Sequence, residues 1–484
     1  MQTPLKLPSQ KTKIVCTIGP SSCSPARLEG MIENGMNIAR LNCSHGEFKE
    51  HAENIRNIRA AAFKTRRMIS ILMDLPGVKM RIGRLQNDSV LLKKGDKVVL
   101  TTRNVLGTGA RIPVEYKQLP QNVSKGKIIF LNDGFIQLRV ERVLVHDIAC
   151  KVLIGGKLLS HKGLNLPGTK LDIDPITDKD LKIVEFGLNH GVNVFGLSFV
   201  ERSKDIIKVR EFARKKGHSV YLVAKIERGG AIENFDEILK AADGVMIARG
   251  DLGVEIPIEE VPGIQKRLIQ KANIMGRPVI TATQMLESMT QNVRPTRAEV
   301  NDVANAILDG TDAIMLSQET AIGDYPVETV RMMAKIAVTT EHQRDEGQLS
   351  DDEGRKISYK VAQRGFLSIT DVTTLSAYRA TQELDARYIL TPTTSGSTAR
   401  RISRFKPHCW IFSFSAKMQV CDFLNFSYGV QPFFLNKKIT HDHQAIFKNL
   451  KKYRLVKKGD TVILTERRLS SHPGDTDSLG IVTL

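Results

Sequence analysis

The chain alternates between short apolar runs and longer segments in which apolar residues recur with a helical period. Eight runs are almost continuously apolar, and they cover residues 13–18, 37–41, 69–74, 192–197, 220–225, 244–249, 278–283 and 312–317. Strands of this kind are typical of a parallel sheet that is covered on both faces. Helix start and stop signals, such as Ser24-Pro25 and Gly35, lie between the runs. The pattern therefore predicts an α/β fold, a (β/α)8 TIM barrel.

Two segments fall outside this alternation. Residues 77–171 alternate polar and apolar positions over short stretches divided by turn residues, which predicts an inserted β-barrel lid domain (domain B). The catalytic barrel (domain A) is then discontinuous and comprises residues 1–76 and 172–341. After a polar stretch at 341–356, residues 342–484 carry further strand-like and helical runs, which predict a C-terminal α/β regulatory domain. Because βα loops lie at the mouth of a barrel, we expect the insert to act as a lid.

The chain is strongly basic, with 71 Lys and Arg against 52 Asp and Glu and a formal net charge of +19. A basic surface attracts either nucleic acid or small phosphorylated molecules. The basic residues are spread along the whole chain without interleaved aromatic residues, so we expect no nucleic-acid partner. No apolar stretch reaches the roughly 18 residues that span a bilayer, so we expect no membrane association. There is no CxxC pair and no secretory signal at the start, which favours a cytoplasmic location.

Polar and charged residues stand at the carboxyl ends of the apolar runs, where a barrel carries its catalytic groups. They are Arg40, Asn42, Ser44, His45, Asp74, Ser198, Lys225, Glu227, Arg249, Gly250, Asp251, Thr283 and Glu319. One interpretation is an internal network of ion pairs, which barrels also contain. The other is a catalytic site, and the number of charged groups at the ends of otherwise apolar strands favours it.

A few of these residues indicate the kind of chemistry. Glu227 and Asp251 follow adjacent strands and suit one Mg²⁺ ion, which prefers one or two carboxylates together with water and substrate oxygens. Lys225 lies two positions before Glu227, so both side chains can point into the barrel mouth. Arg40 is suited to binding a phosphate. A metal ion within a cluster of cations is typical of phosphoryl transfer.

Several motifs resemble those of the pyruvate kinase family. They are 37–46 (NIARLNCSHG), 163–168 (GLNLPG), 221–234 (YLVAKIERGGAIEN), 248–256 (ARGDLGVEI), 281–289 (TATQMLESM) and 294–299 (RPTRAE). The resemblance covers essentially the whole chain. It implies Mg²⁺-dependent phosphoryl transfer from phosphoenolpyruvate to ADP, which gives pyruvate and ATP in the last step of glycolysis.

The resemblance also implies roles for individual residues. Arg40, Lys225 and Thr283 are the implied catalytic residues. Arg40 binds the substrate phosphate, Lys225 stabilises charge on the transferring phosphoryl group, and Thr283 helps to deliver a proton to the enolate through water. The substrate carboxylate is bound at Gly250 and Asp251, at the start of a short helix.

The metal and nucleotide positions follow from the same resemblance. Glu227 and Asp251 hold Mg²⁺, for which Mn²⁺ can substitute. Arg81, Lys162 and His45 bind the nucleotide.

The chain departs from the family pattern at the monovalent-cation site. Asn42, Ser44 and Asp74 match the family's K⁺ ligands, but Leu75 stands where a threonine is usual and offers no side-chain oxygen. Lys79 stands where members that need K⁺ have an acidic residue. Its ammonium can replace the positive charge of K⁺, so we expect K⁺ to be dispensable. The alternative is that Lys79 turns to solvent and K⁺ still binds.

The C-terminal segment contains a hydroxyl-rich turn made of Thr393, Thr394, Ser395, Gly396, Ser397 and Thr398. Backbone amides and hydroxyls at a helix start can hold a phosphate, although the same residues can be an ordinary helix cap. The equivalent loop in the family holds the phosphate of an allosteric activator, so we expect a phosphorylated sugar or nucleotide. Asp475 and Asp477 in a second loop favour a monophosphate. The resemblance also implies a homotetramer.

Two other functions are compatible with a basic barrel. A barrel-shaped binding protein that has lost catalysis would have a broken site, but Lys225, Glu227, Asp251 and Thr283 are all present. Another Mg²⁺-dependent barrel enzyme that acts on enolates, such as an aldolase or a lyase, would need neither the lid nor the C-terminal domain.

Overall fold

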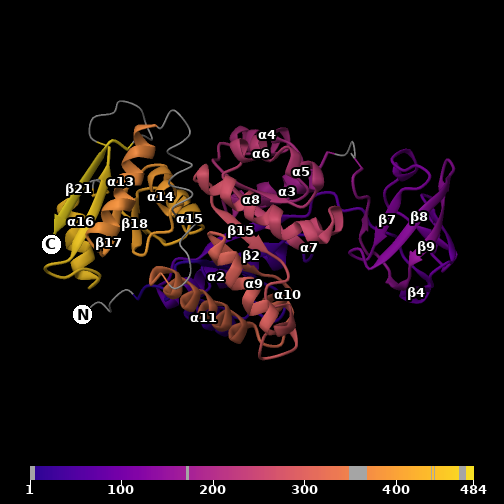
Figure 1. Cartoon of the computed structure of the whole chain (residues 1–484), viewed down its shortest axis with the longest axis horizontal. Coiled ribbons are helices and arrows are strands. Elements are labelled where there is room, and N and C mark those ends of the chain that lie inside the picture. Colours follow the sequence, from indigo (N-terminus) through magenta and orange to yellow (C-terminus); the bar gives the residue numbers. More distant parts are fainter. Residues whose placement is uncertain (1–5, 170–173, 348–367, 438, 441, 468–475) are drawn as a thin grey trace.

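The structure is a computed structural model that describes residues 6–169, 174–347, 368–437, 439–440, 442–467 and 476–484. Its three parts lie in a row, with the C-terminal domain at one end, the barrel in the centre and the lid at the other end (Figure 1). Asp475 and the part of the predicted polar stretch beyond residue 347 lie outside the described residues.

A closed barrel of parallel strands forms the centre of the molecule. The strands are β1 (Lys13–Thr17), β2 (Ile38–Asn42), β3 (Ser70–Leu75), β12 (Val194–Leu197), β13 (Tyr221–Ile226), β14 (Gly244–Ala248), β15 (Val279–Ala282) and β16 (Ala313–Leu316). Strand β1 pairs with both β2 and β16, which closes the sheet. Each strand overlaps one of the predicted apolar runs, so the predicted TIM barrel is confirmed.

Helices surround the barrel and connect its strands. They are α1 (Pro25–Glu33), α2 (Phe48–Thr65), α3 (Asp178–Asn189), α4 (Ser203–Lys215), α5 (Gly229–Glu233), α6 (Phe235–Ala241), α7 (Arg249–Glu255), α8 (Val261–Ile274), α9 (Arg297–Leu308), α10 (Gln318–Ala321) and α11 (Pro326–Asp345). Helices α3 and α9 begin with a threonine cap, in which Thr177 and Thr296 each accept a hydrogen bond from the amide three residues further on. These caps fix where α3 and α9 begin, and therefore how long the preceding loops at the barrel mouth are.

Apolar side chains fill the inside of the barrel. Val15, Leu72, Val223 and Met246 are among the buried residues of this inner cluster, which also includes Phe423 and Phe426 of the C-terminal domain. The Phe423 ring stacks on Tyr221, the first residue of β13, with the ring centroids 4.3 Å apart. The C-terminal domain therefore closes the amino-terminal end of the barrel, and the opposite end is left for polar residues.

The lid lies between β3 and β12 in the sequence. Its strands are β4 (Ser89–Leu92), β5 (Lys97–Thr101), β6 (Arg111–Pro113), β7 (Ile128–Leu131), β8 (Ile136–Val143), β9 (Asp147–Ile154), β10 (Gly156–Leu159) and β11 (Leu164–Asn165). They form one six-stranded sheet in the order β11-β7-β8-β9-β5-β6 and one two-stranded sheet of β10 and β4. The lid has its own apolar cluster, which includes Ile129, Leu138 and Val152.

The C-terminal domain is a five-stranded sheet with helices. Its elements are α13 (Ile369–Glu383), β17 (Tyr388–Pro392), α14 (Ser397–Ser403), β18 (Trp410–Ser415), α15 (Met418–Leu424), β19 (Val430–Phe434), α16 (His443–Lys452), β20 (Thr461–Glu466) and β21 (Ser478–Thr483). The strand order is β19-β18-β17-β20-β21, and only β21 runs antiparallel to its neighbour. Within the described part of the chain, no helix is long and apolar enough to cross a bilayer. The limits predicted for the three domains stay a prediction.

Candidate active site

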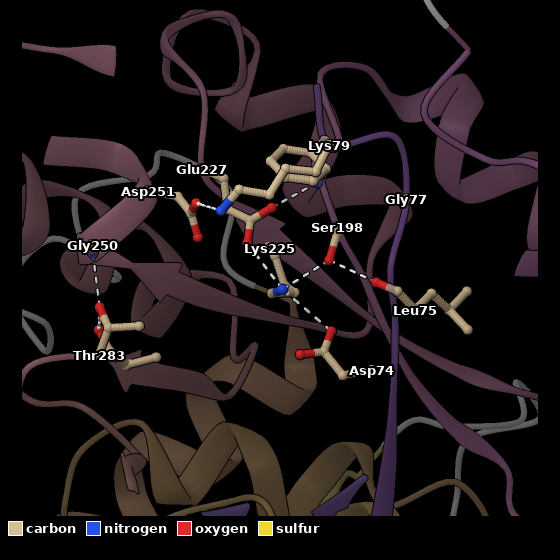
Figure 2. A network of polar contacts seen from close by, with 12 residues as sticks. Asp74, Leu75, Gly77, Lys79, Ser198, Lys225, Glu227, Gly250, Asp251 and Thr283 are labelled. Carbon is tan, nitrogen blue, oxygen red and sulfur yellow. Dashed lines mark hydrogen bonds and ion pairs between the residues drawn. The ribbon is translucent and has the colours of Figure 1, made fainter. Parts of the chain in front are cut away.

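The carboxyl ends of the barrel strands surround a cavity of about 420 Å³. Eight of the predicted site residues line this cavity, and they are Arg40, Asn42, His45, Lys225, Glu227, Asp251, Thr283 and Glu319. Figure 2 shows how the side chains of the central residues point toward one another across the mouth. The structure therefore brings together groups that are up to about 280 residues apart in the sequence.

Arg40 at the end of β2 lies against Asp74 near the end of β3. Its Nε donates to Asp74 Oδ2 at 2.7 Å, Nη2 forms an ion pair with the same oxygen, and Nη1 donates to Thr17 Oγ1 at 2.9 Å. Burial alone would raise the pKa of Asp74, but the positive charges of Lys225 and Arg40 outweigh it and hold the pKa below its ordinary value. Asp74 is thus a buried carboxylate that orients two cations of the mouth.

Lys225 on β13 lies between two carboxylates. Its Nζ is 2.9 Å from Glu227 Oε1 and 3.3 Å from Asp74 Oδ1, and it donates to Ser198 Oγ at 2.8 Å. Ser198 in turn donates to the Leu75 carbonyl at 2.7 Å. Burial on its own would lower the pKa of Lys225, but the charges of Asp74 and Glu227 outweigh it and raise the pKa. The ammonium is therefore a fixed positive charge in the mouth.

Glu227 and Asp251 are the residues suited to hold a divalent metal ion. Glu227 is only 1% exposed, and its Oε2 accepts a hydrogen bond from the Phe199 amide at 2.8 Å. Burial raises the pKa of Glu227 and the negative charge of Asp251 adds to the rise, although Lys225 opposes it. Two carboxylates that repel each other fit one hard cation such as Mg²⁺. Within the described ranges, no group of three or more His, Cys, Asp or Glu could hold a metal, so an ion bound by this pair would need water or substrate oxygens as its other ligands.

Lys79 follows the end of β3 and reaches one of these two carboxylates, Asp251. Its Nζ lies 2.9 Å from Asp251 Oδ1 and 3.9 Å from Asp133 Oδ1 in the lid. The side chain is 29% exposed, so it does not extend into solvent. Among the described residues, the polar contacts of Lys79 involve neither Asn42 nor Ser44. The ammonium lies beside the pair suited to a metal (Figure 2).

Thr283 has a backbone conformation that a β-branched residue rarely adopts, with φ at +71°. Three contacts hold it there. Its Oγ1 accepts a hydrogen bond from the Gly250 amide at 2.7 Å and donates to the Ala282 carbonyl at 2.6 Å, and Arg249 Nη2 donates to its carbonyl at 2.7 Å. Arg249 is fixed in turn by an ion pair with Asp302 at 2.7 Å. Strain of this kind costs about 1–3 kcal/mol and is typical of functional sites.

The positions predicted for a monovalent cation lie next to the cation cluster. Asn42 and Asp74 are directly opposite in the register of β2 and β3. The Ser44 amide donates to Asn42 Oδ1 at 3.2 Å. Leu75 follows Asp74, and its carbonyl accepts the Ser198 hydroxyl. The structure therefore brings these positions together at one side of the mouth.

The residues predicted to bind the nucleotide come from two places. Arg81 and Lys162 lie on the two antiparallel segments that connect the lid to the barrel, where Arg81 pairs with Gly163 and the Ile82 amide donates to the Lys162 carbonyl at 3.0 Å. His45 is exposed on the wall of the cavity. These two groups lie on the lid side and on the barrel side of the mouth.

The predicted phosphate loop, residues 393–398, is remote from the mouth; it follows β17 of the C-terminal domain and includes the first two residues of α14. The Gly396 amide donates to Thr393 Oγ1 at 2.8 Å, and Gly396 has φ at +76°, a value that favours glycine. The Thr398 hydroxyl forms a hydrogen bond with the hydroxyl of Thr476. The loop is therefore a separate structure from the candidate active site.

Thr17 and Phe199 are among the residues of the mouth that are absent from the predicted set. Thr17 is the last residue of β1, and Phe199 comes two residues after β12, so the rule that catalytic groups follow barrel strands could have found both. The conformation of Phe199, with φ at +57°, has no signal in the sequence. Glu319 was predicted with the site, but its oxygens accept backbone hydrogen bonds from Leu286 and Ser317 at 3.3 and 2.6 Å. Glu319 also lines the cavity, so its place in the site stays a prediction.

The barrel, the lid over its mouth and a site of two carboxylates among fixed cations define a phosphotransferase built on a TIM barrel. Residues 9–330 match the family described as "Pyruvate kinase, barrel domain", and residues 371–482 match "Pyruvate kinase, alpha/beta domain". The chain belongs to the pyruvate kinase family and is a kinase.

Individual relatives agree with this assignment. A pyruvate kinase of Thermococcus litoralis is 53% identical over 96% of both chains. One from Geobacillus stearothermophilus is 43% identical over 98% of this chain and 80% of its own. The crystal structure of a pyruvate kinase from Cryptosporidium parvum, 35% identical, superposes with a TM-score of 0.90 and covers 98% of this chain and 96% of that one. A non-catalytic binding protein and an aldolase or lyase are therefore not favoured.

Proposed function

We propose that this enzyme transfers the phosphoryl group of phosphoenolpyruvate to ADP in a Mg²⁺-dependent reaction that yields pyruvate and ATP. The observation that carries the proposal is the position of Lys225, a charged ammonium fixed between Asp74 and Glu227 in the mouth of the barrel. Arg40 also contacts Asp74, and both Arg40 and Lys225 line the cavity. This is the charge distribution that a transferring phosphoryl group requires.

The residues of the chain divide the work in the proposed reaction. Arg40 binds the phosphate of phosphoenolpyruvate. The backbone at the start of α7, at Gly250 and Asp251, binds its carboxylate. The charge of Lys225 acts on the phosphoryl oxygens while the bond between phosphorus and the enol oxygen breaks and phosphorus forms a bond to a terminal phosphate oxygen of ADP. Glu227 and Asp251 would hold Mg²⁺, which would supply further positive charge for the transfer.

The second half of the reaction is a proton transfer. Once the phosphoryl group has left, the enolate needs a proton on its methylene carbon to become the ketone of pyruvate. Thr283 lines the cavity, and its hydroxyl accepts a hydrogen bond from the Gly250 amide. We assign to it the orientation of a water molecule that delivers this proton.

ADP enters between the lid and the barrel in this account. Arg81 and Lys162 bind its phosphates from the base of the lid, and His45 lies on the opposite wall. Closure of the lid excludes water from the transferring group.

A coupled assay tests the proposed reaction. Purified enzyme is supplied with phosphoenolpyruvate, ADP and MgCl₂, and pyruvate is followed through the oxidation of NADH by lactate dehydrogenase. We expect turnover that stops when Mg²⁺ is chelated and resumes with MgCl₂ or MnCl₂. The absence of pyruvate under all these conditions would refute the function.

We propose further that the enzyme does not require K⁺. The support is the position of Lys79, whose ammonium lies beside Asp251 at the mouth rather than in solvent. Turnover is therefore expected in buffers free of K⁺ and NH₄⁺. A rise of about tenfold or more on adding KCl at constant ionic strength would contradict this proposal.

A phosphorylated activator is proposed for the loop Thr393–Thr398. Its hydroxyls and the turn at Gly396 support a phosphate site. Asp477 follows Thr476, which contacts Thr398 of this loop, and its negative charge favours a ligand with a single phosphate. Sugar and nucleotide monophosphates are added in turn to the coupled assay at low phosphoenolpyruvate concentration. We expect at least one to shift the saturation curve, and no shift with any of them would rule the site out.

The assembly state and location are proposals from the family alone. We propose a cytoplasmic homotetramer. Mass photometry of the purified enzyme is expected to give about four times the 53.9 kDa of one chain. A mass of one or two chains would contradict it.

A further inference from the structure

The lid is connected to the barrel by two segments that pair with each other. Arg81 forms an antiparallel bridge with Gly163, and the Leu164 amide donates to the Met80 carbonyl at 2.9 Å. The returning segment also pairs with the lid itself, because Asn165 on β11 lies opposite Phe130 on β7. Any movement of the lid therefore passes through this paired hinge.

One side chain of the hinge reaches the barrel. Asn165 Nδ2 donates to Oε1 of Glu255 at 3.0 Å, and Glu255 is the last residue of α7. Burial raises the pKa of Glu255, and the Asn165 hydrogen bond opposes that rise. The contact thus satisfies a carboxylate that is shielded from solvent, which makes it stronger than a surface hydrogen bond.

The same short helix carries the proposed substrate site at its other end. Gly250 and Asp251 lie in the first turn of α7, and Asp251 contacts Lys79 of the outgoing hinge segment. The lid turn that contains Gly134 also approaches α7, since a Cβ placed on Gly134 would lie 3.6 Å from Val254 Cγ1. Both ends of α7 therefore touch the hinge or the lid.

We infer that Asn165 is a positioning residue for phosphoryl transfer, whose hydrogen bond to Glu255 fixes the hinge against α7 and so sets where the lid stands over the substrate. The inference rests on the proposed function for its kinetic consequence. Asn165 touches neither substrate nor metal in this account. Loss of this hydrogen bond should weaken binding of the nucleotide, which contacts the lid. It should not affect binding of phosphoenolpyruvate, which contacts the barrel.

A polarity exchange tests the inference. In Asn165→Asp, the new carboxylate faces the carboxylate of Glu255, and the hydrogen bond is lost. In Glu255→Gln, the Asn165 amide can still donate to the side-chain carbonyl of the new glutamine. The double variant Asn165→Asp/Glu255→Gln restores a hydrogen bond in the reverse direction. We expect the KM for ADP to rise about tenfold in Asn165→Asp and to return to within about threefold of the wild-type value in the double variant and in Glu255→Gln.

Two controls separate positioning from general damage. Asn104→Asp makes the same change of charge at an exposed site in the lid, and we expect it to leave the KM for ADP within about twofold. Calorimetric binding of phosphoenolpyruvate with Mg²⁺ is expected to be the same in all variants. An unchanged KM in Asn165→Asp, an equal defect in the double variant, or an equal loss of phosphoenolpyruvate binding would overturn the inference.

A structural readout keeps this test independent of the reaction. Amide hydrogen exchange of residues 156–166, measured without substrates, is expected to be faster in Asn165→Asp and to recover in the double variant. If the wild-type enzyme forms no pyruvate, the proposed function fails. The exchange rates still show whether the hydrogen bond between Asn165 and Glu255 holds the hinge. Equal exchange rates in the wild-type enzyme and in Asn165→Asp would show that the hydrogen bond does not hold the hinge.

Discussion

Lys225 keeps its charge although protein encloses it almost completely, with 9% of the residue exposed. An isolated ammonium in such a place would lose its proton, because burial disfavours the charged form. Asp74 and Glu227 reverse this outcome by lying on two sides of the same Nζ. Asp74 is compensated in turn by Arg40, so that the buried charges of the mouth are paired.

Lys79 is the residue for which a charge reversal is most informative. In Lys79→Glu, the ammonium beside Asp251 becomes a carboxylate, and the mouth loses a positive charge that a monovalent cation can restore. We expect the variant to have little activity without K⁺ and to gain about tenfold or more on adding KCl, with tetramethylammonium chloride keeping the ionic strength constant. The measurement is kcat/KM for phosphoenolpyruvate in the coupled assay.

The matched control is Lys94→Glu, which makes the same change at an exposed position of the lid. It should show no dependence on K⁺. If Lys79→Glu is equally indifferent to K⁺, or if the wild-type enzyme responds to K⁺ as strongly as the variant, the assignment of Lys79 is wrong.

The packing of a helix against the barrel decides whether a glycine can be replaced. Gly187 lies in α3, and a Cβ at this position would lie 2.7 Å from Phe195 Cε1 and 2.8 Å from Met73 Sδ. Gly263 in α8 is also helical but has no atom within 4 Å of its would-be Cβ. The same substitution should therefore act in opposite directions at the two sites.

We expect Gly187→Ala to destabilise the enzyme by about 1–3 kcal/mol because α3 must move off the strands. Gly263→Ala should be neutral or stabilise by up to about 1 kcal/mol, because alanine favours helix and reduces the entropy of the unfolded chain. Differential scanning calorimetry under identical conditions checks the order of the melting temperatures. A Gly187→Ala variant that melts at or above the wild type would show that α3 does not pack as described.

The elements of this fold are predictable where one physical rule dominates. Strands buried on both faces must be apolar throughout, and groups for catalysis must stand where those strands end, so Lys225, Glu227 and Asp251 could be found from the sequence. The positive φ of Phe199 could not, because tertiary contacts impose it on a residue that does not prefer it. Likewise, the sequence places Lys79 near the mouth but does not tell which carboxylate its side chain contacts.

The junction between the barrel and the C-terminal domain contains a fully buried lysine. Lys13 begins β1, and its Nζ donates to the carbonyl of Val430, the first residue of β19, at 2.6 Å. The same ammonium lies 5.2 Å from the centre of the Trp410 ring. A titratable group therefore takes part in joining the two parts of the molecule.

Stability of the whole molecule should depend on pH through Lys13. Burial lowers its pKa from 10.5 to about 7, although the charges of Glu341 and Asp312 oppose this and Arg67 adds to it. Between about pH 7 and the ordinary pKa of lysine, the unfolded chain therefore holds a proton that the folded enzyme has lost. Stability from this group rises with pH across that window, and below it the group contributes no pH dependence.

The change Lys13→Met removes this contribution while keeping most of the side-chain volume. We expect the melting temperature of the wild type relative to the variant to rise as the pH increases from 7 to about 9. Lys448→Met, at an exposed position of α16, should give a difference that does not vary with pH. Parallel curves for wild type and Lys13→Met would mean that Lys13 stays charged in the folded enzyme.

The central claim is that a fixed charge at Lys225 drives transfer of a phosphoryl group from phosphoenolpyruvate to ADP. Phosphorus NMR of a mixture of both substrates with Mg²⁺ follows this transfer directly, and Lys225→Met removes the charge while keeping the chain length. We predict loss of the phosphoenolpyruvate signal with matching growth of the ATP signals in the wild type, and a rate lower by about a thousandfold or more in the variant, with its fold intact by circular dichroism. A wild-type enzyme that leaves phosphoenolpyruvate unchanged, or a variant as fast as the wild type, would contradict the account.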